Sequence, residues 1–337
     1  MRRALVIGAP ESLELAERPE LAPGPGEVVV RPTWCGVCGT DLELLHGLVD
    51  PAYVSYPLTL GHEWSGVVEA VGPGVEGLAP GTRCVGEGII PCGRCANCLV
   101  GATNICEVYD EIGFTREGAA GDQMLLPAGV VHPLGDSVSL LDAALAEPSA
   151  VVLTGLEKAR PVEGARVLVV GDGTIGLLAA LFAGLWAPAE LAMAGRRPEQ
   201  EELARAAGVT SFSVSDPPAD AGYDLVIEAA GSPAAFGAAV RAARRGGTVL
   251  LLGLAPSGAT VELPADLLVN NDLTLVASFG ATSAAWSKVV SLLDSGSVAP
   301  GRIVTHRFPL EQFEQAFTEL AEPTGARGKI LLEVERG

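Results

Sequence analysis

The chain has 337 residues, of which 48% are hydrophobic and 19% charged, and its formal net charge is −19. This length suggests two domains, and the apolar content is too high for a disordered chain. The negative charge repels phosphate backbones, which argues against a nucleic-acid-binding protein.

The first part of the chain, up to about residue 148, is predicted to be rich in β-strands. Valine-rich runs at residues 27–32, 66–71 and 82–85 are separated by turns that contain glycine and proline, such as APGPGE. Short runs with this punctuation are typical of β-sheet domains.

Two motifs in this region offer metal ligands. The motif CGVCGTD covers residues 35–41, GHE covers residues 61–63, and Glu147 lies at the far end of the same region. A histidine beside a glutamate is most often a surface pair. A mixed set of thiolate, imidazole and carboxylate also suits a catalytic zinc ion with one position open for water or substrate. These residues alone leave both interpretations open.

Four cysteines follow at short, regular spacing in the segment PCGRCANCLVGATNIC, namely Cys92, Cys95, Cys98 and Cys106. Such steps let one loop place four thiolates around a tetrahedral zinc ion. The alternative is a disulfide cluster, but the chain shows no signal-peptide pattern, is longer than small disulfide-rich domains, and has 7 cysteines, an odd number. The spacing therefore predicts a structural zinc site in a lobe of about residues 84–110.

From about residue 161 the pattern changes to repeated units of strand, glycine turn and apolar helix. This alternation predicts an α/β domain, a doubly wound parallel sheet with helices on both faces. The apolar run at residues 173–189 is just short of the roughly 20 residues of a membrane span. It follows a strand and a glycine turn, so we expect a buried helix, no membrane association and a cytoplasmic protein.

The motif GDGTIG, at residues 171–176, follows a predicted strand and opens this helix. Its glycines allow a tight turn and close approach of a pyrophosphate, and the helix N-terminus presents amide groups to it. In this context the motif predicts a dinucleotide site, formed by Gly171, Gly173, Thr174, Ile175 and Gly176.

The end of the next strand indicates which dinucleotide is bound. Sites for NAD usually place Asp or Glu there to bind the adenosine ribose, but this chain has Gly195, followed by Arg196 and Arg197. A small residue and two guanidinium groups suit a 2′-phosphate, so the sequence predicts NADP(H). The alternative is that both arginines are merely solvated at the start of a helix.

The motifs CGVCGTD, GHEWSG, the four cysteines, the Glu-Pro pair at 147–148 and GDGTIG occur in this order along the whole chain. In this combination the sequence resembles the zinc-dependent alcohol and polyol dehydrogenases of the medium-chain dehydrogenase/reductase superfamily. The resemblance implies a GroES-like catalytic domain of residues 1–148 and 282–337, a Rossmann domain of residues 149–281, and an active site in the cleft between them. It also implies two zinc ions per chain and a homodimer or homotetramer, commonly joined by sheet edges such as residues 272–279.

The resemblance further implies which side chains bind the catalytic zinc. Cys38, His62 and Glu147 would be its ligands, and Glu63 would ligate directly or through water. Asp41 would hold the other imidazole nitrogen of His62 and so fix its tautomer.

The expected reaction interconverts an alcohol and a ketone or aldehyde with NADP(H), and Thr40 would relay the proton of the zinc-bound alcohol. Many family members carry histidine three residues after the relay hydroxyl, where this chain has Glu43, as glucose dehydrogenases of the family do. The motif GHEWSG together with GFTREG, at residues 113–118, is similar to the motifs of bacterial enzymes that oxidise cyclitols. We therefore expect a polyol, sugar or cyclitol substrate; the alternative for Glu43 is a solvated helix residue.

The predicted zinc ligands also distinguish this chain from two other classes of protein. A zinc-free quinone or enone reductase of the superfamily would lack Cys38, His62 and the four-cysteine loop. A catalytically inactive NADPH-binding regulator would keep the glycine turn and lose zinc ligands. The sequence retains every expected ligand, which argues against both.

Overall fold

The computed structural model describes residues 1–215, 217 and 222–335. The chain divides into two compact units. Unit 1 comprises Met1–Ala150, Ala281–Thr324 and Lys329–Gly337, and unit 2 comprises Val151–Gly280 and Gly325–Gly328.

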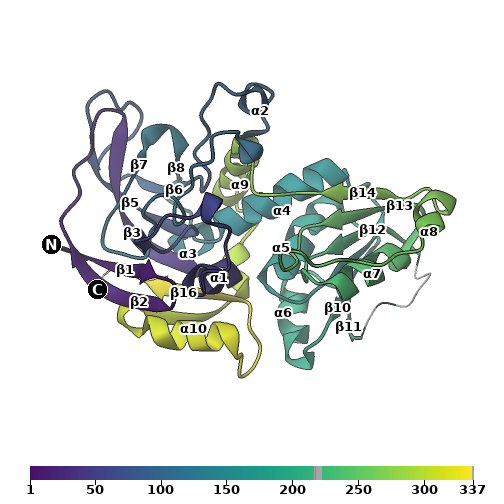
Figure 1. Ribbon diagram of the computed structural model, residues 1–337. Helices are drawn as coiled ribbons and strands as arrows, with labels where there is room; N and C mark the ends of the chain where they lie inside the picture. Colours follow the sequence, from purple (N-terminus) through teal and green to yellow (C-terminus); the bar gives the residue numbers. More distant parts are fainter. Residues whose placement is uncertain (216, 218–221, 336–337) are drawn as a thin grey trace. The chain divides into compact units, whose positions relative to one another are not determined.

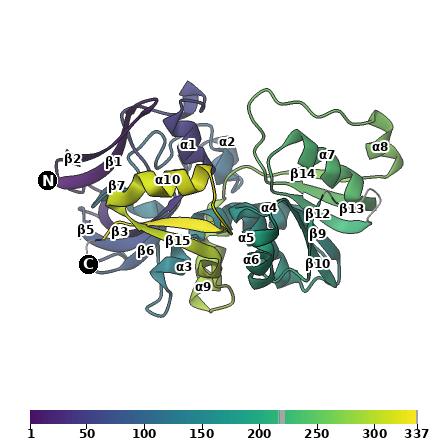
Figure 2. The same cartoon turned by 90° about the horizontal axis from the view of Figure 1, so that it is seen from below.

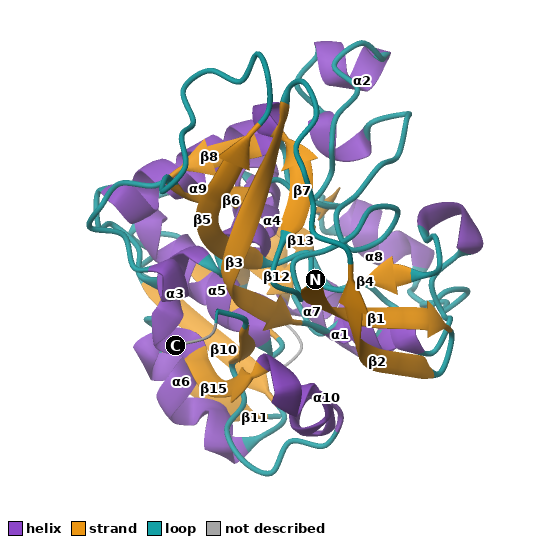
Figure 3. Cartoon of the chain, turned by 90° about the vertical axis from the view of Figure 1, so that its left-hand side faces the viewer, coloured by secondary structure: helices purple, strands orange, loops and turns teal. Residues whose placement is uncertain are grey.

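Unit 1 contains a seven-stranded and a three-stranded sheet, and Figure 3 shows β3, β5 and β6 side by side. The larger sheet has the order β15 (Val304–Pro309), β16 (Lys329–Glu333), β3 (Glu27–Val37), β5 (Trp64–Val71), β6 (Arg83–Gly86) and β8 (Val131–Pro133), with β7 (Met124–Pro127) also paired to β3. The smaller sheet has the order β2 (Ser12–Arg18), β1 (Arg2–Ala9) and β4 (Leu58–Thr59). Only β15 and β16 pair in parallel among these strands; the other pairs are antiparallel.

The helices of unit 1 are short except for α9, α10 and α4, the last of which runs on into unit 2. In Figure 2, α10 lies along β15. It packs against both β15 and β16. The helices are α1 (Gly39–Leu45), α2 (Ala96–Leu99), α3 (Leu140–Ala143), α4 (Ala146–Ala159), α9 (Ser283–Asp294) and α10 (Phe313–Ala321). Short 3₁₀ turns lie at Pro51–Tyr53, Thr103–Ile105, Ala128–Val130, Pro300–Ile303 and Leu310–Gln312.

Unit 2 is built on a six-stranded parallel sheet, visible in Figure 1. Its order is β11 (Ser211–Val214), β10 (Glu190–Gly195), β9 (Arg166–Val170), β12 (Tyr223–Glu228), β13 (Ala243–Leu251) and β14 (Thr274–Ala277). The strand order reverses between β9 and β12, and in open α/β sheets ligands bind outside the carboxyl ends of strands at such a point.

Helices cover both faces of this sheet. Alternate strand residues, among them Leu168 and Val170, pack against α7, whereas Val169 approaches Gly176 of α5 from the other face. The helices are α5 (Thr174–Ala183), α6 (Glu201–Ala206), α7 (Pro233–Ala242) and α8 (Ala265–Asn270), with 3₁₀ turns at Gly184–Trp186 and Pro198–Gln200. The predicted combination of a β-rich domain and a Rossmann sheet is therefore confirmed.

The apolar run at residues 173–189 forms α5 and the 3₁₀ turn after it. Most side chains of α5 are buried against the sheet. Within the described part of the chain, no helix combines the length and apolarity needed to cross a membrane.

Candidate active site

The first candidate site lies where three strands of unit 1 meet. Strands β5 and β16 both pair antiparallel with β3, with Trp64 opposite Cys35 and Ile330 opposite Val37. This register brings the residue after β3, the residues before β5 and the first residue of β16 together at one end of these strands. The side chains collected there are Cys38, His62, Glu63 and Lys329.

Three of these side chains form a possible metal-binding group. One ligand atom each from Cys38, His62 and Glu63 lies within 4.8 Å of the others, and Cys38 Sγ is 3.3 Å from His62 Nε2. His62 and Glu63 are buried. A thiolate, an imidazole and a carboxylate are the ligand types that zinc accepts, so the donor set fits this ion.

The start of α1 fixes the position of Cys38. Its Sγ accepts a hydrogen bond from Thr40 N at 3.3 Å, and the Asp41 carboxylate accepts one from Cys38 N at 2.8 Å. This reciprocal pair is a capping box in which cysteine is the N-cap residue. Thr40 and Glu43 are half-buried and lie three positions apart on α1, where side chains are neighbours.

The charges around His62 favour a cation. Its Nδ1 lies 3.6 Å from Asp41 Oδ1, and both atoms are buried without a hydrogen-bond partner among the described residues. Burial lowers the pKa of His62, but the negative charges of Cys38 and Asp41 outweigh it and raise this pKa well above its ordinary value. Surroundings that attract a proton in this way also attract a divalent metal ion.

Lys329 was not anticipated from the sequence. It is 1% exposed, and its Nζ forms an ion pair with Glu63 Oε2. Burial lowers the pKa of Lys329, but Glu63 and then Cys38 raise it above its ordinary value. Gly36 leaves room for the pair, because a Cβ atom there would lie 2.8 Å from Lys329 Cε. The available signal was a lysine that opens the otherwise apolar strand KILLE.

Two further carboxylates lie in the same electrostatic environment. Glu147, in the first turn of α4, is not part of the group of three ligands. Burial and then the charge of Glu63 raise the pKa of Glu147 to about 8. Glu111, also missed from the sequence, accepts a hydrogen bond from the Tyr109 hydroxyl, and burial raises the pKa of Glu111. Its signal was its place just before the motif GFTREG.

The four cysteines of residues 92–106 form a second possible metal-binding group. Their sulfur atoms lie within 4.8 Å of one another. Cys92 N donates to Cys106 Sγ and Cys98 N donates to Cys95 Sγ, each at 3.4 Å. Backbone N–H groups of Glu107 and Cys98 lower the pKa of Cys95 to about 6, which favours a thiolate. All seven cysteines are described, and none of them forms a disulfide.

The glycine turn of unit 2 presents an open helix N-terminus. Gly173 is the N-cap of α5 and provides no side-chain cap. Apart from the residues adjacent to it in the chain, no described residue has a heavy atom within 4 Å of a Cβ atom built on Gly173, so the space beside this turn is open. Thr174 and Ile175 are half-buried in the first turn of α5. Free amides at this point suit a pyrophosphate, so the chain's residues fit a dinucleotide.

The segment Gly325–Gly328 is bound to this turn. The fully buried Gln200 accepts a hydrogen bond from Arg327 N at 2.7 Å and donates to Arg327 O at 2.9 Å. Gln200 also donates to Asp172 O, and the Thr174 hydroxyl donates to Gly328 O at 3.0 Å. These bonds hold the segment in unit 2, whereas the resemblance to the family implied that it is part of the catalytic domain.

The structure also brings the predicted arginines to the glycine turn. Arg196 is exposed, whereas Arg197 is half-buried, and its Nη2 lies 3.5 Å from Asp172 Oδ1. The two arginines therefore differ in their surroundings, which the sequence did not indicate.

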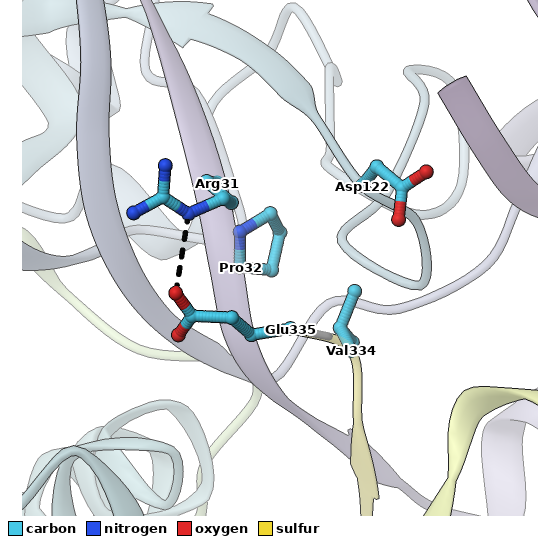
Figure 4. A pocket seen from close by; sticks show the side chains of 5 residues that line it. All are labelled: Arg31, Pro32, Asp122, Val334 and Glu335. Carbon is cyan, nitrogen blue, oxygen red and sulfur yellow. Dashed lines mark ion pairs between the residues drawn. The ribbon is translucent and has the colours of Figure 1, made fainter. Parts of the chain in front are cut away.

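A separate hollow in unit 1 has a volume of ≈ 370 Å³. Figure 4 shows the side chains around it. It is lined by Arg31, Pro32, Asp122, Val334 and Glu335, and Arg31 Nε lies 3.4 Å from Glu335 Oε1. None of the candidate ligands or nucleotide-binding residues lines it.

Comparison with known families agrees with this architecture. Residues 24–136 match the alcohol dehydrogenase GroES-like domain, and residues 142–324 match the glucose dehydrogenase C-terminus. The chain belongs to the zinc-type alcohol dehydrogenases of the medium-chain dehydrogenase/reductase superfamily. The family predicted from the motifs is therefore confirmed, and with it an oxidoreductase of the alcohol dehydrogenase type.

Relatives of known sequence or structure match nearly the whole chain. An L-threonine 3-dehydrogenase from Chromobacterium violaceum is 29% identical over 99% of both chains. A zinc-binding dehydrogenase from Sinorhizobium meliloti, solved bound to NADP, is 28% identical over 99% of both chains with a TM-score of 0.91. An alcohol dehydrogenase from Escherichia coli, solved with NADH, is 26% identical over 98% of this chain and 99% of its own, also with a TM-score of 0.91.

Proposed function

We propose that this protein is a zinc-dependent dehydrogenase that interconverts a polyol, sugar or cyclitol and its carbonyl form, with a preference for NADP(H). The observation that carries the proposal is the group of Cys38, His62 and Glu63 at the ends of β3 and β5. Its thiolate, imidazole and carboxylate are suited to an ion that must also accept a substrate oxygen.

The catalytic roles follow from the positions of the side chains. When bound, zinc would lower the pKa of a ligated alcohol and the nicotinamide would take up its hydride. Cys38 and His62 would hold the ion, with Glu147 as a further ligand and Asp41 orienting the imidazole. Glu63 would remain a weaker ligand, because Lys329 competes for its carboxylate. Thr40 would take the alcohol proton and Glu43, on the same helix, would pass it on.

A second zinc ion is proposed for the four cysteines of residues 92–106. Their sulfur atoms converge, and N–H groups of the loop donate to them. A site closed by four protein ligands leaves no position for substrate, so its contribution would be to the stability of the lobe.

The preference for NADP(H) is inferred from the end of β10. Position 195 is a glycine and not the acidic residue typical of NAD sites, and the exposed guanidinium of Arg196 suits a 2′-phosphate. The Sinorhizobium relative was solved with NADP and the Escherichia relative with NADH, so the fold itself does not decide between the cofactors.

A polyhydroxylated substrate is supported by carboxylates near the metal-binding group. Glu111 is held by Tyr109, and the Phe114 ring of the motif GFTREG lies 5.2 Å from the His62 ring. Glu43 is half-buried on α1. Carboxylates accept hydrogen bonds from neighbouring hydroxyl groups, and the match to the glucose dehydrogenase C-terminus favours the same substrate class.

We also propose a homodimer or homotetramer joined through β14. This strand lies at the edge of the parallel sheet, with Leu275 38% exposed and Phe279 beside it 54% exposed. Unpaired apolar edges readily accept a second chain. Light scattering should give a mass of two or four chains, and Leu275→Asp should shift it toward one.

The function is tested by assaying polyols, sugars, cyclitols and secondary alcohols with NADP+ and NAD+ in parallel, alongside zinc analysis. Two zinc ions per chain and reduction of NADP+ with a polyhydroxylated substrate are expected. Activity only on simple alcohols would exclude the substrate class, and higher kcat/KM with NAD+ would exclude the cofactor preference. Full turnover after removal of all zinc would exclude the mechanism.

A further inference from the structure

The buried residue Asp172 stands between the first two glycines of the GxGxxG motif. Its Oδ2 accepts hydrogen bonds from the backbone N–H groups of Arg196 and Arg197, at 2.9 Å and 3.1 Å. Its Oδ1 lies 3.5 Å from Arg197 Nη2. One carboxylate from the glycine turn therefore binds both residues that directly follow β10.

This carboxylate occupies the space of a side chain at position 195. A Cβ atom built on Gly195 would lie 2.7 Å from Asp172 Oδ2 and 2.9 Å from Phe212 Cζ. In dinucleotide sites selective for NAD, an acidic side chain at the end of this strand reaches the adenosine ribose. The structure therefore has a carboxylate where position 195 offers none.

We propose that Asp172 is a specificity-determining residue, which supplies from the glycine turn the ribose-side carboxylate that Gly195 lacks and so limits the preference for a 2′-phosphate. The inference rests on the dinucleotide site of the proposed function. Cofactor preference then depends on two opposing charged groups, Asp172 and Arg196, and not only on the absence of an acidic residue at position 195.

The opposing group is Arg196. Arg197 is already paired with Asp172, and its Nη1 is buried without a hydrogen-bond partner among the described residues. The Arg196 guanidinium is exposed, and within the described residues it forms no hydrogen bond or ion pair. Arg196 therefore attracts a 2′-phosphate with its full charge, while the charge of Asp172 repels the phosphate and reduces the contribution of Arg197.

The test compares two ligands that differ only in the 2′-phosphate, adenosine 5′-monophosphate and adenosine 2′,5′-bisphosphate. Their dissociation constants are measured by calorimetry on the zinc-loaded full chain, so that turnover plays no part. Asp172→Asn removes the charge but keeps a side-chain oxygen for the two N–H groups. We expect the preference for the bisphosphate to rise about tenfold, because Arg197 becomes available to the 2′-phosphate and the phosphate is no longer repelled by a charge at position 172. The affinity for the monophosphate should stay within about threefold of wild type.

Matched variants separate the contributions. Arg196→Ala should lower the preference for the bisphosphate about tenfold, and Arg197→Ala should lower it less. Combining Asp172→Asn with Arg197→Ala should retain the part of the gain that comes from lost repulsion. Asp172→Ser serves as a second neutral variant if asparagine impairs folding, with the same expected rise.

The inference is overturned if the preference stays within about twofold of wild type, or falls, in the neutral variant that folds. Asp172 would then only hold the backbone of the arginines. A wild-type protein that binds the monophosphate more tightly would refute the proposed NADP preference. In that case a rise in the Asp172 variant would still support the role of this carboxylate.

Discussion

The four cysteines of residues 92–106 come from one short segment of the chain, whereas Cys38, His62 and Glu63 flank the ends of two strands that are separated in sequence. The cysteine loop is partly exposed, and its sulfur atoms are hydrogen-bonded mainly by the loop's own backbone. His62 and Glu63 are buried and lie beside a buried cation, Lys329. A local ligand set thus needs little from the rest of the fold, while a set assembled across strands depends on register and on compensated charge.

The largest expected effect is on turnover, after removal of a ligand from the buried group. His62→Ala should lower kcat at least about 10³-fold, since a metal acting on a substrate oxygen contributes several kcal/mol. Elemental analysis should show one zinc per chain instead of two, and NADPH should still bind, because the candidate nucleotide-binding residues lie in unit 2. The control His46→Ala changes an exposed histidine and should leave kcat within about twofold. Near wild-type turnover in His62→Ala would refute the ligand assignment.

The next largest effect is on stability, through the buried cation. Lys329→Met leaves Glu63 with an uncompensated charge, which should cost about 3–5 kcal/mol of unfolding free energy and lower Tm by roughly 10 °C. Adding Glu63→Gln should recover part of this loss, since the buried charge is then removed. Arg205→Met breaks the exposed pair with Glu201 and should change Tm by less than about 2 °C. If Lys329→Met and Arg205→Met lowered Tm equally, Lys329 would not compensate a buried charge.

The cysteine loop should show a smaller, local effect. Cys98→Ser should remove one zinc and lower Tm by roughly 5–10 °C, because binding free energy of a structural metal is also folding free energy. The zinc held by Cys38 and His62 should remain. Arg94→Ala alters an exposed residue between the ligands and should keep both ions. A full zinc content and an unchanged Tm in Cys98→Ser would exclude a structural site.

The smallest expected effect concerns the room around the buried pair. Gly36→Ala places a Cβ atom 2.9 Å from Glu63 Cβ and 2.8 Å from Lys329 Cε, so we expect a loss of about 1–3 kcal/mol in denaturant unfolding. Gly129→Ala meets no described atom within 4 Å apart from its chain neighbours and should be close to neutral. If both substitutions behave alike, the pair is not confined as the geometry indicates.

Several features could be predicted from the sequence because they are local. The spacing of Cys92, Cys95, Cys98 and Cys106 predicts convergent sulfur atoms, and the structure brings them together. The glycine motif after an apolar strand predicts the turn that opens α5, and the alternation of strands and helices predicts the parallel sheet. In each case the contacts that matter form within one loop or one repeated unit, so a short window of sequence contains the information.

The tertiary structure alone decided how distant side chains share space and charge. It paired Lys329 with Glu63 through the register of β16 and β5 on β3, which no local pattern reports. It also placed the Asp172 carboxylate beside Gly195. The sequence shows no acidic residue at the end of β10, but the fold brings one there from the glycine turn. A linear pattern shows which side chain each position carries, but which side chain fills a given volume depends on how separate segments pack.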